Sequence, residues 1–483
     1  MPRPARLAAC LVLLALAESA GAQTVDRPAL GPAPAFQPPA VERFELSNGL
    51  PVLFVPKPGV PLVQVDLLVK AGAVADPEGR GGLASLTADL MDEGAGGRTA
   101  LELADAVDYL GIDLTSRADL QSLQVRLHTP VSKLDSALAL FADVALRPTF
   151  AEAELERLRA SRLTSLAQRR DESRAIASVL VDQTLYGDAS PYGRPTSGSP
   201  ASVGALTRAD VEAFHDAAVR PGNAALVVVG AVDRAAIAPR LEALFGAAAW
   251  PEGGAGGALA GGAVPEPTQV TGREVYLVDK PGAAQTVVRI GRVGAARSTP
   301  DYAALQVLNT ILGGSFTSRL NQNLRETNGY TYGAGSSFSF RPVAGPFVAS
   351  ADVQTDVTGP ALAEFFRELD GIRTRVPDEE LAKARNYLAL SFPEPFGSVR
   401  GTAALVGALY LDGLPLDAYD TYTRDVLAVT ADDLERVAAE YVDPAAVAVV
   451  LVGDRATIED EVRALDLGPL QTLTIDDVLG PQE

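Results

Sequence analysis

Two polar side chains, Arg325 and Tyr332, flank a tight corner of the chain and could act together on one oxygen atom. A guanidinium and a phenol are both hydrogen-bond donors, and two donors aimed at one carbonyl can stabilise the oxyanion that forms when it is attacked. The corner is Asn328-Gly329, and the two side chains lie seven positions apart. The pattern also fits a helix-capping arginine and a tyrosine packed in a sheet, so these residues alone leave both interpretations open.

The residues around this corner predict the elements that must hold it. Apolar side chains at helical spacing over 305–312 predict an amphipathic helix that breaks at Gly313-Gly314. A second helix is predicted over 316–324. From Thr331 the apolar period falls to two, which predicts a strand. The corner would then join a helix to a strand.

Length and composition describe a globular chain of several domains. The 483 residues exceed one ordinary domain, and we expect about two to four. The chain is 47% hydrophobic and 21% charged, with a net charge of −20. This charge disfavours binding to nucleic acid or to an anionic membrane surface. Beyond the N-terminus, no segment is long and apolar enough to predict a membrane span.

The N-terminus predicts a cleaved secretory signal over 1–22. Arginines precede a short apolar run at 7–17, and Ala20-Gly21-Ala22 forms a small-residue cleavage site. Cys10, the only cysteine, precedes most of the apolar run, which argues against lipoprotein anchoring. The mature chain would then hold no disulfide and no thiolate site. We predict export to a periplasm.

The two halves of the chain repeat one another. Residues 206–230 align without gaps on 429–453, at an offset of 453 − 230 = 223. Gly72 and Gly294, each at a predicted strand end, give an offset of 294 − 72 = 222. Two distant anchors with nearly one offset indicate a duplication of whole domains. Each copy is expected to be an α+β unit with one largely antiparallel sheet covered by helices.

Domain boundaries are predicted from this repeat and from composition. Residues 23–40 are rich in Pro and Ala and are expected to be disordered. Residues 251–270 form a Gly- and Pro-rich linker, and 471–483 form a tail. The N-terminal domain then spans 41–250, and the C-terminal domain spans 271–470.

The two halves, the linker and the segment LRETNGYTYG at 324–333 together resemble the pitrilysin/insulinase-type metallopeptidases, the group with the inverted zinc motif. The resemblance covers roughly 41–452. It also rests on FELSNGL at 44–50, on Gly81-Gly82 and on RPGN at 220–223. It implies two peptidase-type domains that the linker joins into a clamshell.

In active members of this family, H-x-x-E-H on a first-half helix supplies two zinc ligands and a general base. No such motif occurs in this chain, and the matching positions hold Ser85, Ala88 and Asp89. The resemblance places a further glutamate ligand about seventy-five residues later, among Thr164, Ser165 and Leu166. The resemblance therefore implies that this chain holds no catalytic zinc and hydrolyses no peptide by itself.

The two histidines of the chain do not rebuild a metal site. His128 and His215 each lack a second ligand four residues further on. We expect both to be structural or surface residues.

The second half retains the residues that the resemblance assigns to the substrate. Family members carry an arginine and a tyrosine, seven residues apart, that reach the substrate at the zinc, and Arg325 and Tyr332 have this spacing. Tyr330 is a weaker candidate for the tyrosine's role. Gly313 and Gly314 lie where related processing peptidases have a glycine-rich substrate loop, although two glycines fit a helix break equally well.

The resemblance implies a zinc-less subunit of a heterodimeric periplasmic peptidase. A homologous partner with H-x-x-E-H would hold the zinc, and the substrates would be peptides or unfolded proteins. This chain would supply chamber wall, peptide binding along a sheet edge and oxyanion stabilisation. Three alternatives stay open: a scaffold or assembly protein, a peptide-binding protein that does not cleave, and a self-sufficient peptidase with an unconventional metal site.

Overall fold

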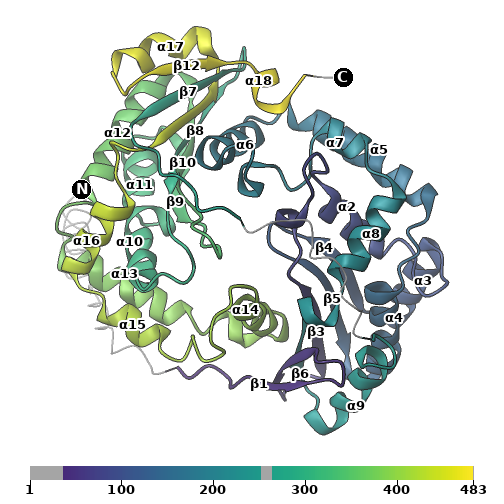
Figure 1. Ribbon diagram of the computed structural model, residues 1–483. Coiled ribbons are helices and arrows are strands. Elements are labelled where there is room, and N and C mark those ends of the chain that lie inside the picture. The colour runs from purple at the N-terminus through teal and green to yellow at the C-terminus, as the bar shows by residue number, and fades with distance from the viewer. Residues whose placement is uncertain (1–35, 252–263, 482–483) are drawn as a thin grey trace, which may run out of the picture. The chain divides into compact units, whose positions relative to one another are not determined.

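The computed structural model describes residues 36–251 and 264–481, and these residues form two six-stranded sheets covered by helices (Figure 1). The predicted signal, Cys10 and most of the Pro-rich segment fall outside the described residues, as does part of the predicted linker. In the described ranges, no helix has the length and apolar character that crossing a membrane requires.

The first sheet has the strand order β1-β2-β6-β3-β5-β4. Only β2 and β6 run parallel, and every other neighbouring pair is antiparallel. The β1–β2 hairpin turns at Gly49, whose φ of 80° suits a residue without Cβ. The strands are β1 Glu42–Glu45, β2 Pro51–Pro56, β3 Leu62–Val69, β4 Asp113–Ala118, β5 Leu123–Pro130 and β6 Ala224–Gly230.

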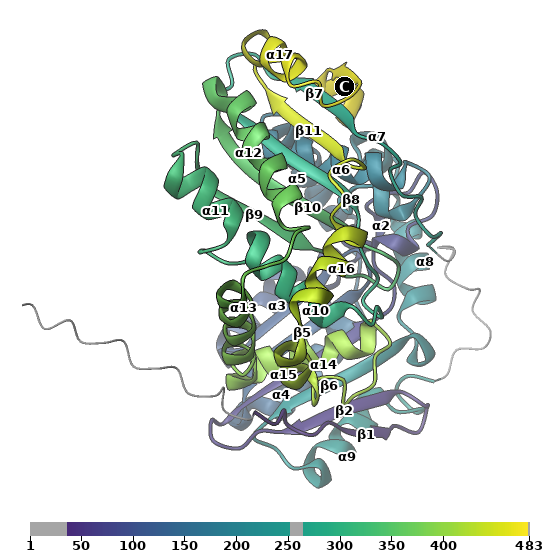
Figure 2. The ribbon, with the colours of Figure 1, turned by 90° about the vertical axis from the view of Figure 1, so that its left-hand side faces the viewer.

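The second sheet, of order β12-β7-β11-β8-β10-β9, repeats the first with one difference. The outermost strand β1 arrives antiparallel through the hairpin, whereas β12 comes from the C-terminus and runs parallel to β7. At the other edge lies β9 (Figure 2). The strands are β7 Glu274–Asp279, β8 Gln285–Val293, β9 Thr331–Phe338, β10 Pro346–Gln354, β11 Ala448–Gly453 and β12 Leu470–Leu473. The predicted α+β class with a duplicated domain is confirmed, with sheets that are mixed.

Helices bury their apolar faces against one side of each sheet and form two separate cores. The repeat is visible in their capping, because α8 and α16 both begin with a Thr–Asp capping box. In the first half the helices are α2 Leu83–Met91, α3 Ala100–Leu110, α4 Leu134–Leu146, α5 Glu152–Arg169, α7 Pro200–Gly204, α8 Arg208–Ala218 and α9 Arg234–Phe245. In the second half they are α10 Tyr302–Asn309, α11 Arg319–Asn321, α12 Thr358–Gly371, α13 Asp378–Ser391, α15 Tyr422–Ala428, α16 Ala431–Tyr441, α17 Arg455–Ala464 and α18 Ile475–Leu479.

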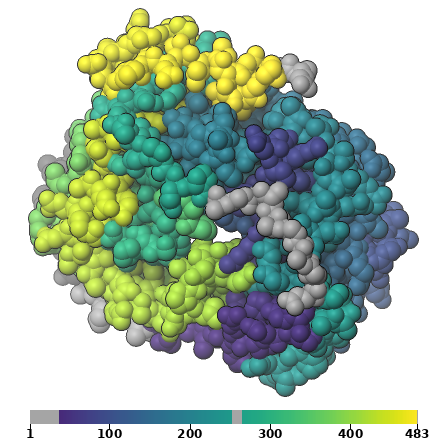
Figure 3. All heavy atoms as spheres, viewed as in Figure 1, coloured from purple at the N-terminus to yellow at the C-terminus, as the bar shows by residue number. Residues whose placement is uncertain are grey.

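The two halves exchange one helix each. Helix α6, Ser173–Tyr186, belongs to the first half by sequence but packs on β8 and β11 of the second sheet. Its counterpart α14, Val399–Leu411, packs on β2, β3 and β6 of the first sheet. Figure 1 shows both helices beside the strands of the other half, and in Figure 3 the segment around residue 400 lies against the strands near residue 50. Each sheet is therefore completed by the other half of the chain.

Candidate functional site

An arginine occupies the place where the family resemblance puts zinc ligands. Ser85 and Asp89 lie one turn apart on α2, and Arg162 reaches both from α5. One guanidinium nitrogen donates to Ser85 Oγ at 2.8 Å, and the other pairs with Asp89 Oδ2. Ala88, between them, is fully buried. The side chain of Arg162 is only 15% exposed, so its charge is fixed against α2.

This arrangement does not fit a catalytic zinc ion. Zinc needs three neutral or anionic protein ligands, whereas the positions here offer one hydroxyl, one carboxylate and a cation. Two unit charges 4 Å apart repel by about 4 kcal/mol at an effective dielectric constant of about 20, and a divalent ion beside Arg162 would meet twice that before solvent screening. Among the described residues, no group of three or more His, Cys, Asp or Glu side chains could hold a metal ion.

The positions expected for the further glutamate contribute no ligand either. The hydroxyls of Thr164 and Ser165 donate to the carbonyl groups one turn back in α5, and Leu166 is buried. Sequence reasoning did not single out Arg162. The sequence does place Arg162 one turn before Leu166 on the same helix, and a long side chain at that position can reach α2.

Burial and Arg162 act on Asp89 in opposite directions. Burial raises the pKa of Asp89, and the adjacent guanidinium of Arg162 lowers it by charge and by hydrogen bonding. Both histidines are occupied locally. His128 Nδ1 lies 3.0 Å from Gln64 Oε1, and His215 Nε2 lies 3.1 Å from the carbonyl oxygen of Ala145. Burial lowers the pKa of both imidazoles.

Arg325 and Tyr332 lie on either side of the predicted corner. Arg325 belongs to a π-helical turn, Gln322–Thr327, that continues α11, and Tyr332 lies on β9. The guanidinium carbon of Arg325 is 4.7 Å from the centre of the Phe316 ring, and its Nε is 3.4 Å from Glu326 Oε1. Tyr332 is 91% exposed. Within the described structure, no hydrogen bond joins Arg325 to Tyr332.

The surroundings of this pair include Tyr330 and Phe316. Tyr330 is half-buried and packs against the core of the second half, whereas the phenol of Tyr332 has no hydrogen-bond partner among the residues that the structure describes. The helix predicted over 316–324 begins only at Arg319, because Ser318 is in an extended conformation. Phe316 therefore stands in a loop with 65% of its surface exposed.

Gly313 and Gly314 end a π-helical turn, Thr310–Gly314, that extends α10. A Cβ on Gly313 would lie 2.0 Å from the backbone nitrogen of Ser336 in β9, and one on Gly314 would lie 2.6 Å from Asn309 Nδ2. Gly313 is therefore needed for close packing of the helix end against β9, whereas Gly314 packs against Asn309 of α10. Whether they also contact a substrate stays a prediction.

Comparison with known proteins places these features in a family. A family model described as "Insulinase (Peptidase family M16)" matches residues 52–198, and one described as "Peptidase M16 inactive domain" matches residues 205–388. The chain belongs to the M16 (insulinase/pitrilysin) peptidase family. The boundary between the two matches, at about residue 200, lies inside the first structural half rather than at the linker.

The similar proteins carry names that differ on catalysis. An uncharacterised zinc protease of Mycobacterium leprae is 30% identical over 299 residues, which span 61% of this chain and 65% of that protein. A non-peptidase homolog of Helicobacter pylori is 22% identical over 408 residues, 83% of this chain and 91% of that protein.

A solved structure supports the M16 fold over most of the chain. The crystal structure of a peptidase M16 inactive domain from Pseudomonas fluorescens aligns with a TM-score of 0.79 and 26% identity, covering 86% of this chain and 97% of that one.

Proposed function

We propose that this M16 chain is the zinc-less subunit of a two-chain peptidase, in which a homologous H-x-x-E-H subunit holds the metal. This chain would bind the peptide and donate hydrogen bonds to the oxyanion from Arg325 and Tyr332. Export to a periplasm is part of the proposal and rests on the predicted signal at 1–22.

The contact of Arg162 with Ser85 and Asp89 carries this proposal. A cation of the chain itself lies at that place: Arg162 pairs with Asp89, although 42% of the Asp89 side chain is exposed. The charge satisfies the carboxylate and repels a divalent ion. In the proposed complex, the catalytic metal is held by the other chain.

The second half supplies the features that a substrate-binding subunit needs. Among the described strands, β9 lies at the edge of its sheet beside β10. Asn321 and Gly313 cover its outer edge at Ala334 and Ser336, so an added peptide strand would pair at the start of β9, around Tyr332. Tyr332 projects from this strand and is exposed, and Arg325 lies just before it. Two donors beside a peptide-binding edge can contact the carbonyl of a peptide bound there.

Affinity purification of the tagged chain from its host, with intact-mass analysis of co-eluting proteins, is the first test. The expected result is one partner of similar size that contains H-x-x-E-H, with peptide hydrolysis only by the mixture. In that mixture Arg325→Met and Tyr332→Phe should each lower kcat about 100-fold, as loss of an oxyanion donor does. The matched control is Tyr109→Phe, because Tyr109 is equally exposed on α3.

A non-cleaving peptide-binding protein is the second candidate, and the open start of the edge strand β9 around Tyr332 favours it. It predicts peptide affinity without any partner and no change in partner activity. A chain that purifies alone and binds peptides would support this candidate over the split peptidase. A chain that binds neither a partner nor peptides would leave a scaffold role.

A further inference from the structure

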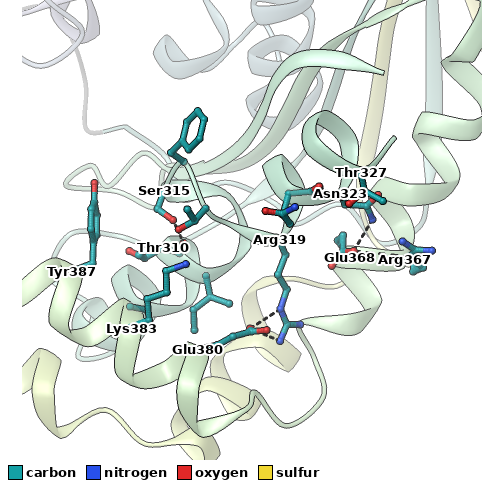
Figure 4. A pocket seen from close by; sticks show the side chains of 15 residues that line it. Thr310, Ser315, Arg319, Asn323, Thr327, Arg367, Glu368, Glu380, Lys383 and Tyr387 are labelled. Carbon is teal, nitrogen blue, oxygen red and sulfur yellow. Dashed lines mark hydrogen bonds and ion pairs between the residues drawn. The ribbon is translucent and has the colours of Figure 1, made fainter. Parts of the chain in front are cut away.

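A cavity of about 820 Å³ opens in the second half, beside the segment that carries Arg325. It lies between the Thr310–Gly314 turn and α13 (Figure 4). By chain order α10 and α13 repeat α2 and α5, the helix pair that holds Ser85, Asp89 and Arg162. In the first half the arginine bridges the pair, whereas in the second half the space beside the pair is open.

The charges around this cavity leave one cation available. Arg319 pairs with Glu380, with nitrogen–oxygen distances of 2.9 and 2.8 Å. Asn323 Nδ2 donates to Glu368 at 2.7 Å, and Arg367 pairs with Glu364 at 2.5 Å. Lys383 lines the same cavity and has no ion-pair or hydrogen-bond partner in the described part of the chain.

Hydroxyl groups and aromatic rings complete the surroundings of Lys383. In Figure 4 its side chain extends from α13 towards the side lined by Thr310 and Ser315. Phe316 and Tyr387 also line the cavity, and they are 65% and 52% exposed. The hydroxyls of Thr310 and Ser315 donate to backbone carbonyls, so the Lys383 ammonium is the group here that suits a carboxylate. Exposed aromatic rings suit an apolar neighbour of that carboxylate.

We propose that this cavity binds a carboxylate of the bound peptide, with Lys383 as its ion-pair partner and Phe316 and Tyr387 in contact with the adjoining apolar residue. This inference rests on the peptide binding in the proposed function and adds a preference to it. The carboxylate can be the peptide's C-terminus or an acidic side chain. The ring of Phe316, which also contacts Arg325, connects this cavity to the proposed oxyanion donors.

Fluorescence anisotropy with fluorescein-labelled peptides rich in Ala and Leu tests the preference on the purified full chain. One peptide ends in a free carboxylate, one in an amide, and two amidated peptides carry an internal Glu or Gln. We expect the free acid, the Glu peptide or both to bind about tenfold more tightly than their neutral counterparts. The pair that shows the difference identifies the source of the carboxylate.

Variants of Lys383 connect the preference to the cavity. Lys383→Met should abolish the difference, Lys383→Arg should retain it, and Lys383→Glu should reverse it towards a peptide with an internal Lys. The control is Lys133→Met, which removes an exposed lysine of the first half and should change nothing. Because Lys383 is exposed, we expect all three variants to fold, and circular dichroism checks this.

Two outcomes overturn the inference and are distinguishable from failure of the proposed function. If all peptides bind equally and Lys383→Met has no effect, the carboxylate site is wrong while peptide binding stands. If Lys383→Met and Lys133→Met lower the affinity for the acidic peptides to the same extent, the effect comes from the net charge of the chain rather than from a site at Lys383. If no peptide binds the chain or its complex, the proposed function fails as well.

Discussion

Arg400 donates a hydrogen bond to Asp113 at 2.6 Å, although the two residues lie 287 positions apart in the chain. Arg400 lies in the first turn of the exchanged helix α14, and Asp113 begins β4 of the first sheet. On the other exchanged helix, Arg174 pairs with Asp352 of the second sheet. The same exchange thus carries an arginine–aspartate contact in both directions, in addition to the apolar packing.

Leu68→Ala should destabilise both halves, because Leu68 of β3 is buried against α14. Removing a buried leucine side chain costs about 2–5 kcal/mol. Hydrogen exchange should become faster in β3 and also in α14, and the midpoint of urea unfolding should fall. Leu101→Ala is the control, since Leu101 is 72% exposed on α3. Faster exchange confined to β3 would mean that the halves are not coupled through this helix.

Arg162→Met should destabilise the chain near neutral pH, because it leaves the ionised Asp89 without its partner. The loss should be only about 1 kcal/mol, since 42% of the Asp89 side chain is exposed to water. Loss of the guanidinium also lets the pKa of Asp89 rise further. A raised carboxyl pKa favours the folded state only while the group is protonated, so the difference from wild type should vanish as pH falls. Urea unfolding across a pH series measures this.

The double variant Arg162→Met with Asp89→Asn provides the control for that charge effect. It should recover most of the lost stability at neutral pH, since an amide needs no counter-ion. If it stays as unstable as Arg162→Met, packing of the arginine stem rather than its charge stabilises the site. Zinc content by mass spectrometry should stay at background in all three proteins, because no set of three ligands is created.

Asp66→Asn should stabilise the chain above pH 6. Burial raises the pKa of Asp66 from its ordinary 3.8 to about 6, and the hydrogen bond from Gln64 and the charge of Arg126 oppose this only in part. The folded state therefore binds the proton more tightly than the unfolded state, and wild-type stability falls as pH rises from about 4 to about 6. The gain should approach at most about 3 kcal/mol above pH 6 and disappear near pH 4.

The exposed Asp135, whose side chain is 74% exposed, gives the matched control for that measurement. Asp135→Asn should leave the slope of unfolding free energy against pH unchanged. An unchanged slope in Asp66→Asn as well would show that folding does not raise the pKa of Asp66.

Gly313→Ala should loosen β9, because the added Cβ would lie 2.0 Å from the Ser336 nitrogen. We expect a loss of about 1–3 kcal/mol from overpacking and faster hydrogen exchange in β9. Gly397→Ala is the control, since no atom lies within 4 Å of a Cβ at that position. If Gly313→Ala weakens peptide binding without any change in stability or exchange, the glycine acts on the substrate directly rather than through packing.

The sequence pattern predicts where helices and strands lie better than it predicts which elements pack together. The buried strands β6 and β11 and their preceding helices were found from the repeat, since a continuous Val-rich run after a capped helix has few other interpretations. The exchange of α6 and α14 was not predicted. The pattern of an amphipathic helix such as α6 shows which of its faces is apolar, but not which of the two sheets that face covers.

The candidate site divides in the same way. The absence of H-x-x-E-H and the spacing of Arg325 and Tyr332 can be read from the residues. The role of Arg162 cannot, because its side chain reaches across from α5 to α2 and only the packing of these helices brings the charge to Ser85. The apolar spacing predicts a helix at Phe316, yet Phe316 stands exposed beside Arg325.

The exchanged helices also set the order in which a growing polypeptide can become a finished protein. The first sheet is complete in sequence at Gly230, yet the helix that covers one of its faces ends at Leu411. During synthesis that apolar face of the sheet therefore stays exposed to solvent until α14 has been made. Contacts between such distant segments slow folding and leave aggregation-prone intermediates. We therefore expect the nascent chain to depend on a holding chaperone until α14 has emerged.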